Sequence, residues 1–294
     1  MARIILILFI IILNGCAAPA HLATDNGELA KIERRTGGRL GVVLIDSRGN
    51  MLLSNRADER FAMCSTMKLP LAAMAMDAIE RGQLDGATPL PITQANVTGY
   101  APTVAAALAA GRTEMTISEA AQAAVVTSDN GAANLLLGLI GGPDGFTRRM
   151  RGWGDTVTRL DRTETALNSN LPGDPRDTAS PAATSAWLRL ALGTEEIRPL
   201  TRRQLREWTA ATTTGVDRVR AGLPAGWQAG DKTGTCARAG QPNPEYNDIG
   251  WFKTQAGEDY YFTVYLDRPT VGYDEAEAAL AEAGRVMARA VGAE

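Results

Sequence analysis

The sequence predicts an α/β (α+β) protein in which an antiparallel five-stranded sheet is flanked by helices and interrupted by an inserted all-α region. Two observations carry this prediction. Segments rich in β-branched and aromatic residues occur near both ends of the chain, whereas the apolar residues of its long middle recur at helical spacing. A sheet assembled from both chain ends, with helices inserted between its strands, fits this order.

The length of 294 residues, 45% of them hydrophobic, suits one large domain or two closely packed domains. We assign residues 21–63 and 210–294 to an α/β domain and residues 64–209 to an all-α domain. Residues 1–20 are interpreted as a signal segment. The sequence contains no internal repeats.

The first elements are expected to be a helix and a hairpin. A short polar helix is predicted around Glu28–Arg35. The β-rich segments Arg39–Asp46 and Met51–Ser54 flank the turn Ser47–Asn50 and are predicted to pair as a hairpin.

A long apolar helix should follow the hairpin. Apolar residues recur at helical spacing over Ser65–Arg81, and Gly82 is placed to cap the C-terminus of that helix. Pro70 removes a backbone donor and crowds the preceding turn, so a local bend is expected there.

Two further helices are predicted to meet at a break. Thr116–Glu119 is a capping-box pattern that opens a helix towards Thr127, and a second helix covers Ala132–Ile140. The tripeptide Ser128-Asp129-Asn130 lies between them. The segment Leu160–Ser180, rich in Asp, Asn, Pro and Gly, indicates a long loop without secondary structure, which is uncommon unless the loop is functional.

The C-terminal part alternates between helices and strands. Ser180-Pro181 opens a helix that ends before Gly193, and Thr201 is expected to cap another. A final helix covers Asp274–Ala290. Three strands are predicted between these helices, at Gln228–Thr235, Tyr246–Thr254 and Tyr260–Leu266.

The N-terminus is typical of an export signal. Arg3 precedes an unbroken apolar run, Ile4–Leu13, which is too short to span a bilayer. Two processing outcomes fit equally: ordinary cleavage after Ala18-Pro19-Ala20, or lipoprotein cleavage within Leu13–Cys16 that leaves a lipid anchor on Cys16. Either outcome places the mature protein in the periplasm or outside the cell.

Composition excludes several function classes. The net charge is −3 with no basic cluster, so nucleic acid is not an expected partner. The single histidine, His21, lies in or beside the signal segment, so the mature chain has no imidazole for a Ser-His-Asp triad or a typical zinc site. We therefore expect no metal and no cofactor. Any serine nucleophile needs a base other than histidine.

One candidate nucleophile is Ser65 in Ser65-Thr-Met-Lys68. Residues three apart share a helix face, which brings the Lys68 amine beside the Ser65 hydroxyl. Only four of the 30 basic residues are lysines, and lysine, unlike arginine, can lose its proton when buried. The competing interpretation is a helix-capping serine next to a solvated lysine.

Two more motifs follow in order. Ser128-Asp129-Asn130 lies about sixty residues after Lys68, and Lys232-Thr233-Gly234-Thr235, on a predicted strand, follows about a hundred residues later. Each alone is compatible with a turn or a surface strand. In this order and spacing the three motifs resemble those of the class A serine β-lactamases, and the resemblance spans essentially the whole mature chain.

That resemblance implies the serine β-lactamase and penicillin-binding transpeptidase fold and assigns roles to residues. Ser65 attacks the lactam carbonyl, the N–H groups of Ser65 and Thr235 form the oxyanion hole, and Ser128 relays a proton to the leaving nitrogen. Asn130 holds the acylamino side chain. The substrate carboxylate is expected to contact Lys232, Thr233, Thr235 and Arg218. Tyr100 is expected to line the mouth of the site.

The long loop matches the omega loop of that family. Glu164 and Asn168 correspond to the residues that hold the deacylating water, since a carboxylate with an amide can orient and deprotonate water. Arg162 and Asp177 match the pair that joins the ends of the loop. Whether Lys68 or Glu164 is the base in acylation stays open.

Cys64 and Cys236 flank the first and third motifs. An even pair of cysteines in an oxidising compartment suggests a disulfide, and two buried free thiols are the alternative. Their placement, with Thr235, resembles the carbapenem-hydrolysing subgroup of class A, which implies carbapenem turnover.

Two other functions share part of this apparatus. A penicillin-binding D-alanyl-D-alanine peptidase has the same serine, lysine and Lys-Thr-Gly elements, and a non-catalytic β-lactam receptor would be acylated once. The segment Glu164–Asn168 argues against the peptidase. The expected partner is a small β-lactam, with membrane contact only through an anchor on Cys16, and the family favours a monomer. The preferred β-lactam class is not encoded in any motif.

Overall fold

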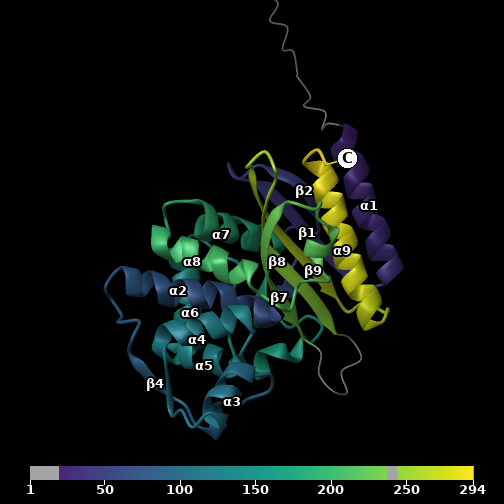
Figure 1. Ribbon diagram of the computed structural model, residues 1–294. Helices are drawn as coiled ribbons and strands as arrows, with labels where there is room; N and C mark the ends of the chain where they lie inside the picture. Colours follow the sequence, from purple (N-terminus) through teal and green to yellow (C-terminus); the bar gives the residue numbers. More distant parts are fainter. Residues whose placement is uncertain (1–19, 237–243, 294) are drawn as a thin grey trace, which may run out of the picture.

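The computed structural model describes residues 20–236 and 244–293, which form a five-stranded antiparallel sheet with helices on both faces (Figure 1). The strand order is β2-β1-β9-β8-β7, so strands from the two chain ends lie side by side and the predicted sheet is confirmed. The strands are β1 Arg39–Asp46, β2 Met51–Asn55, β7 Gln228–Thr235, β8 Glu245–Lys253 and β9 Asp259–Asp267.

Alternation of side chains along the central strand explains why both faces of the sheet are covered. Tyr261 and Tyr265 of β9 are fully buried on one face with Val43 of β1. Phe262 and Val264 are equally buried on the other face, in a separate apolar cluster. Because β9 is apolar on both faces, it can only occupy the interior of a covered sheet.

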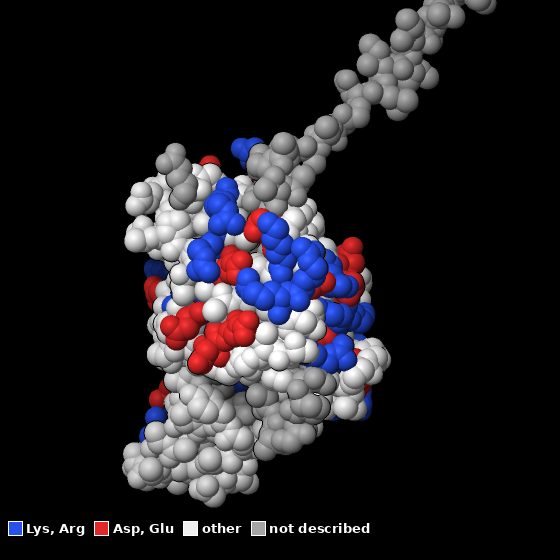
Figure 2. All heavy atoms as spheres, turned by 90° about the vertical axis from the view of Figure 1, so that its right-hand side faces the viewer, with Lys and Arg blue, Asp and Glu red and all other residues white. Residues whose placement is uncertain are grey.

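Two helices from opposite chain ends, α1 (Ala20–Thr36) and α9 (Tyr273–Ala290), cover the outer face of the sheet. Arg35 of α1 forms an ion pair with Glu282 of α9 at 2.5 Å. Positive and negative side chains lie next to each other on this side of the molecule (Figure 2). Within the described residues no helix is long and apolar enough to cross a membrane.

The other face of the sheet is covered by the helical middle of the chain. Helix α7 packs against β9 and β1, and α2 is buried among the other helices. The helices are α2 Lys68–Glu80, α3 Pro102–Ala109, α4 Ile117–Val126, α5 Asn130–Leu139, α6 Gly142–Gly152, α7 Pro181–Gly193 and α8 Pro199–Ala210; the 3-10 helices are η1 Cys64–Met67, η2 Gln94–Asn96, η3 Ala166–Ser169 and η4 Val219–Gly222. Two small sheets pair β3 Phe61–Ala62 with β6 Thr178–Ala179, and β4 Pro89–Pro91 with β5 Glu114–Thr116.

The helix expected over residues 65–81 differs at its start. Residues Cys64–Met67 form a 3-10 turn and the α-helix begins at Lys68. Pro70 is therefore the third residue of α2, in the first turn, where its missing N–H has no partner within the helix. The change from 3-10 to α-helix takes the place of the expected bend. Gly82 has the positive φ of 70° that a C-terminal glycine cap adopts.

Two other expectations are corrected. Thr201 is not a helix cap, because α8 begins at Pro199 and Thr201 instead donates its hydroxyl to Glu80 at 2.8 Å. The segment 160–180 is not free of secondary structure, since it contains η3 and β6. The predicted signal segment and Cys16 lie outside the described residues, apart from the start of α1 at Ala20. The predicted division into two domains stays a prediction.

Candidate active site

Ser65 lies in the 3-10 turn that leads into α2. The Lys68 amine donates a hydrogen bond to the Ser65 hydroxyl at 2.9 Å, so the expected contact between the two side chains is present. The Lys68 side chain starts at the first residue of α2 and is fully buried. The alternative of a solvated surface lysine is therefore wrong.

Lys68 is the centre of a buried polar cluster. Its amine donates to the Ser128 carbonyl at 2.7 Å and to Asn130 Oδ1 at 2.5 Å, and it lies 3.1 Å from Glu164 Oε1. Burial lowers the pKa of the Lys68 amine, and the negative charge of Glu164 opposes this effect. A buried amine with a lowered pKa can accept a proton from a neighbouring hydroxyl.

The second motif lies at the break between α4 and α5. Ser128 has a positive φ of 57°, and Asp129 caps α5 by accepting from the Ala132 N–H at 2.9 Å. The second oxygen of Asp129 accepts from the backbone N–H of Thr103 at 2.8 Å. Asp129 is therefore structural and fixes the neighbouring Ser128 and Asn130 on either side of it.

The third motif runs along the edge strand β7. The Lys232 amine donates to Ser128 Oγ at 3.0 Å and is fully buried, which together with the charge of Lys68 brings its pKa well below the usual value. At Gly234 a Cβ atom would lie 2.7 Å from the Met63 carbonyl oxygen. Glycine therefore permits β7 to approach the turn that carries Ser65.

Arg218 links β7 to α9. Its guanidinium donates to Thr235 Oγ1 at 2.8 Å and forms an ion pair with Glu277 at 3.0 Å. The Thr233 hydroxyl shares a hydrogen bond of 2.7 Å with the Thr214 hydroxyl. The residues expected to meet a substrate carboxylate thus form one connected strip.

The loop from residue 160 to 180 places Glu164 at the cluster. Asn168 Nδ2 donates to Glu164 Oε2 at 2.7 Å, while Glu164 Oε1 faces Lys68. Asn134 of α5 holds the backbone of Glu164 from both sides, with hydrogen bonds of 2.9 Å to its carbonyl and 3.0 Å from its N–H. The ends of the loop are joined by Arg162 and Asp177 at 2.5 Å.

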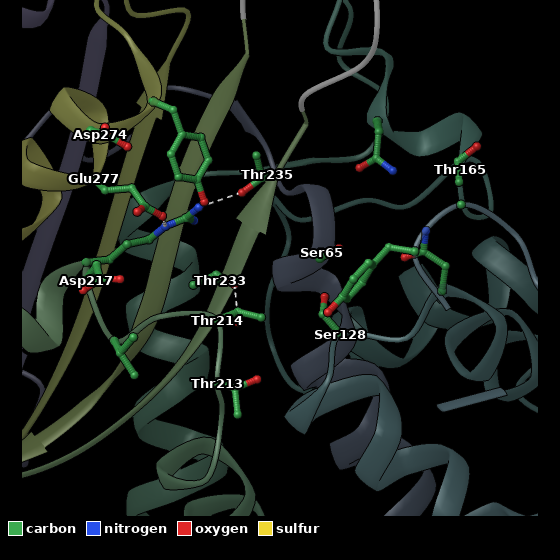
Figure 3. A pocket seen from close by; sticks show the side chains of 17 residues that line it. Ser65, Ser128, Thr165, Thr213, Thr214, Asp217, Thr233, Thr235, Asp274 and Glu277 are labelled. Carbon is green, nitrogen blue, oxygen red and sulfur yellow. Dashed lines mark hydrogen bonds and ion pairs between the residues drawn. The ribbon is translucent and has the colours of Figure 1, made fainter. Parts of the chain in front are cut away.

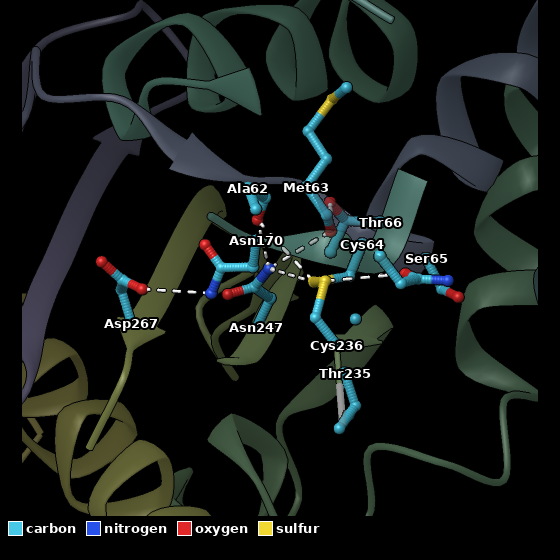
Figure 4. The surroundings of a disulfide bond; sticks show 12 residues. Ala62, Met63, Cys64, Ser65, Thr66, Asn170, Thr235, Cys236, Asn247 and Asp267 are labelled. Atoms are coloured by element: carbon cyan, nitrogen blue, oxygen red, sulfur yellow. Dashed lines mark hydrogen bonds between the residues drawn. A yellow bond between two sulfur atoms is a disulfide. The ribbon is translucent and has the colours of Figure 1, made fainter. Parts of the chain in front are cut away.

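Cys64 and Cys236 form a disulfide beside Ser65, with Cα atoms 5.5 Å apart, so the expected bridge is confirmed (Figure 4). It connects η1 to the end of β7. Asn247 of β8 lies beneath it and donates to the Ala62 carbonyl at 2.8 Å. The Cys236 sulfur is 3.5 Å from Asn168 Oδ1, so the bridge also contacts the loop that carries Glu164.

A cleft of about 880 Å³ opens above the cluster (Figure 3). Lys68, Glu164 and Lys232 lie beneath its surface, whereas eight of the predicted residues line it: Ser65, Tyr100, Ser128, Asn130, Asn168, Arg218, Thr233 and Thr235. The sequence motifs missed the other lining residues, among them Asp217, Tyr273, Asp274 and Glu277. Asp217 adjoins Arg218, but no local pattern predicts that the first turns of α9 reach the same cleft.

Among residues 20–236 and 244–293, one group brings three possible metal donor atoms together, those of Cys64, Cys236 and Glu245. Both sulfurs of this group are joined in the disulfide and are not thiolate ligands.

The geometry agrees with what comparisons with known proteins find. A family model described as "Beta-lactamase enzyme family" matches residues 26–291. The chain belongs to this β-lactamase family. Among curated relatives, the β-lactamase L2 of Stenotrophomonas maltophilia is 37% identical over 95% of this chain and 90% of its own length. The "carbapenem-hydrolyzing beta-lactamase KPC" of Klebsiella oxytoca is 41% identical over 95% of this chain and 93% of its own.

Solved structures place this β-lactamase in class A. An ancestral class A β-lactamase has a TM-score of 0.85 at 41% identity, covering 90% of this chain and 99% of that one. A β-lactamase from Xanthomonas campestris has a TM-score of 0.86 at 38% identity, covering 92% and 99% respectively. The family resemblance inferred from the three motifs is therefore confirmed.

Proposed function

We propose that this class A β-lactamase hydrolyses the amide bond of β-lactams through an acyl-enzyme on Ser65, and thereby gives resistance to these antibiotics. The observation that carries the proposal is the buried cluster in which Lys68 contacts both Ser65 and Glu164. A nucleophile, an amine with a lowered pKa and a carboxylate held by Asn168 are the groups that acylation and deacylation require.

In the acylation half, Ser65 Oγ attacks the lactam carbonyl and its proton passes to Lys68 or Glu164. Positive charge from the start of α2 and the backbone N–H groups of Ser65 and Thr235 would stabilise the oxyanion. The C–N bond breaks, and Ser128 gives its proton to the ring nitrogen and regains the one that Ser65 released, through Lys68, whose amine lies 3.4 Å from Ser128 Oγ. Lys232, 3.0 Å from Ser128 Oγ, orients that hydroxyl.

In the deacylation half, Glu164 and Asn168 orient a water molecule towards the ester carbonyl. Glu164 accepts a proton from the water as the new C–O bond forms, and Ser65 leaves with a proton returned through the cluster. Lys68, 3.1 Å from Glu164, stabilises the carboxylate that does this work.

Substrate recognition is assigned to the strip along β7. Lys232, Thr233, Thr235 and Arg218 would bind the carboxylate that β-lactams carry on the second ring. Asn130 would hold the acylamino group, and Tyr100, which is 58% exposed at the mouth of the cleft, would pack against the substrate.

The intact mass of the mature protein, followed after mixing with a penicillin, tests the proposal. We expect rapid formation of hydrolysed penicillin with a transient adduct, and Glu164→Ala should turn that adduct into a persistent one. A persistent adduct on the unaltered protein would instead support a penicillin-binding peptidase or a receptor. The control is Glu275→Gln, which removes an exposed carboxylate. Its adduct should be as transient as that of the parent protein.

Carbapenems are proposed as part of the substrate range. The Cys64–Cys236 bridge and the likeness to a relative named as carbapenem-hydrolysing support this. Purified enzyme should release hydrolysed carbapenem over many turnovers. A stable acyl adduct without product release would contradict the idea.

The location of the protein is likewise a proposal. The N-terminal segment supports export to the periplasm or beyond, with either a cleaved signal or a lipid anchor on Cys16. A monomer is proposed from the family resemblance alone. Mass spectrometry of the N-terminal peptide from exported protein distinguishes the two, because lipoprotein processing leaves an acylated Cys16 as the first residue. A native mass corresponding to one chain would support the monomer.

A further inference from the structure

One wall of the cleft carries two carboxylates that the proposed catalytic steps do not use. Asp217 precedes the 3-10 turn η4, and Asp274 lies in the first turn of α9; both are exposed and line the cleft (Figure 3). The cation next to Asp217 in the chain, Arg218, is already paired with Glu277 at 3.0 Å. No ion pair among the described residues includes Asp217 or Asp274, so this wall keeps two uncompensated negative charges.

An aromatic ring lies on the same wall. Tyr273, the first residue of α9, is 53% exposed and lines the cleft beside Asp274. Its ring packs edge-on against Tyr246 of β8, with ring centroids 5.5 Å apart, which limits its motion. A supported aromatic face next to carboxylates is the combination that binds organic cations.

The floor of the cleft is built differently. Lys68 and Lys232 are buried beneath it, and both amines approach Ser128 Oγ. Hydrogen-bond donors therefore lie below the reacting groups, beside the Glu164 carboxylate that contacts Lys68, whereas exposed carboxylates without a cation partner within the described ranges lie on the wall formed by η4 and α9. A ligand that carries an anionic and a cationic group at the matching separation would satisfy both regions.

The chemistry of bicyclic β-lactams places a substituent on that wall. In carbapenems and cephalosporins, the ring carbon next to the one that bears the carboxylate carries the variable group. Because that carbon adjoins the one that bears the carboxylate, a carboxylate bound to Thr235 and Arg218 would place the group next to these two residues. Asp217, Tyr273 and Asp274 line that side.

We propose that this wall makes the enzyme selective for zwitterionic β-lactams, whose substituent next to the carboxylate carries a positive charge. The proposal rests on the proposed hydrolytic function and names the substrate class within it. Asp217 and Asp274 are specificity residues that attract the cationic group, and Tyr273 offers it an aromatic face.

The test uses two cephalosporins with the same acylamino side chain, one with a quaternary ammonium group on the C3 substituent and one with an uncharged C3 substituent. In Asp217→Asn/Asp274→Asn, we expect kcat/KM for the cationic compound to fall about threefold to tenfold, as for two exposed ion pairs. The value for the uncharged compound should change by less than about twofold. Added salt should reduce the preference of the parent enzyme, because exposed pairs are screened.

A matched control is Asp58→Asn/Glu275→Gln, which removes the same two charges at exposed positions outside the cleft. It should leave the ratio of the two kcat/KM values unchanged. Equal losses for both compounds in the cleft variant, or the same change in the control, would overturn the proposal. Absence of turnover of both compounds by the parent enzyme would instead reject the hydrolytic function.

Discussion

At the residue scale, the protonation of Lys68 depends on two opposing effects, its burial and the charge of Glu164. Burial lowers the pKa of its amine, and the carboxylate of Glu164, 3.1 Å away, raises it. Removing the carboxylate of Glu164 should therefore lower the pKa of the Lys68 amine further.

The variant Glu164→Gln tests which group accepts the Ser65 proton. Without the negative charge of Glu164, the pKa of Lys68 falls further, so the neutral amine persists to lower pH. If Lys68 is the base in acylation, the acid limb of the acylation rate moves to lower pH. Stopped-flow measurement of the acylation rate across pH gives the position of this limb. Asn134→Asp is not a suitable control for Glu164→Gln, because it adds a charge instead of removing one. Loss of rapid acylation at every pH would assign the base to Glu164 instead.

Residue-scale predictions from the sequence succeeded where local geometry decides. The spacing of Ser65 and Lys68 within one helical turn is enough to predict their contact, which the structure has at 2.9 Å. Glu164 is different, because nothing local brings it to Lys68 and only the family resemblance suggested it. Asp217 and Asp274 carried no signal, since their shared wall depends on how α9 packs against the sheet.

At the element scale, the loop of residues 160–180 is held by one buried carboxylate. Asp177 Oδ1 accepts from the backbone N–H groups of Asp161 and Arg162 at 2.7 and 2.9 Å, and its Oδ2 pairs with the Arg162 side chain. Because Asp177 is fully buried, these contacts are protected from water and salt. The loop that carries Glu164 depends on them.

We expect Asp177→Asn to slow deacylation by about tenfold, while acylation changes by less than about twofold. The substitution removes the charge that balances Arg162 and costs about 1–3 kcal/mol of local stability. Pre-steady-state kinetics with a chromogenic cephalosporin separates the two rates. Arg176→Gln breaks an exposed ion pair in the same loop, with Asp174, and should leave both rates unchanged. Equal slowing of the two steps in Asp177→Asn would contradict the assignment.

Strands were predicted more closely than helices in this chain. The predicted bounds of β1 and β7 match the structure, since both ends of each strand are marked by turns or by a change in polarity. The helix α6 was missed because it opens with Gly142-Pro143-Asp144-Gly145, which resembles a loop, although Phe146 and Met150 bury its inner face. Tertiary packing overrides weak local propensity there.

At the scale of the whole molecule, the sheet built from the two chain ends contacts the helical middle of the chain where η1 packs against β7. The bridge between Cys64 and Cys236 joins residues separated by 172 positions and fixes the start of α2 against β7. This juxtaposition brings Lys232 to Ser128 and creates the cleft. The same region holds a buried acid, Glu245, whose protonation couples the stability of the fold to pH.

Glu245 is fully buried, and neither of its carboxyl oxygens has a hydrogen-bond partner in the described part of the chain. Burial, and next the charge of Asp267 directly opposite on β9, raise the pKa of Glu245 well above its ordinary 4.5. The folded state therefore keeps a proton that the unfolded chain releases above about pH 4.5. Its contribution to stability is complete below that pH and is lost as pH rises through the folded-state pKa.

The variant Glu245→Gln has no proton to gain or lose, so its stability should not carry this dependence. Between the two pKa values, the free energy of unfolding of the parent should fall relative to the variant by about 1.4 kcal/mol for each pH unit. Urea unfolding at several pH values from 5 to 8 measures the difference, with exposed Glu275→Gln as the control. Parallel curves for parent and Glu245→Gln would mean that Glu245 is ionised in the folded protein. The buried carboxyl would then need a cation that balances it, and Arg39 or Arg268, which already pair with Asp267, would have to be shared.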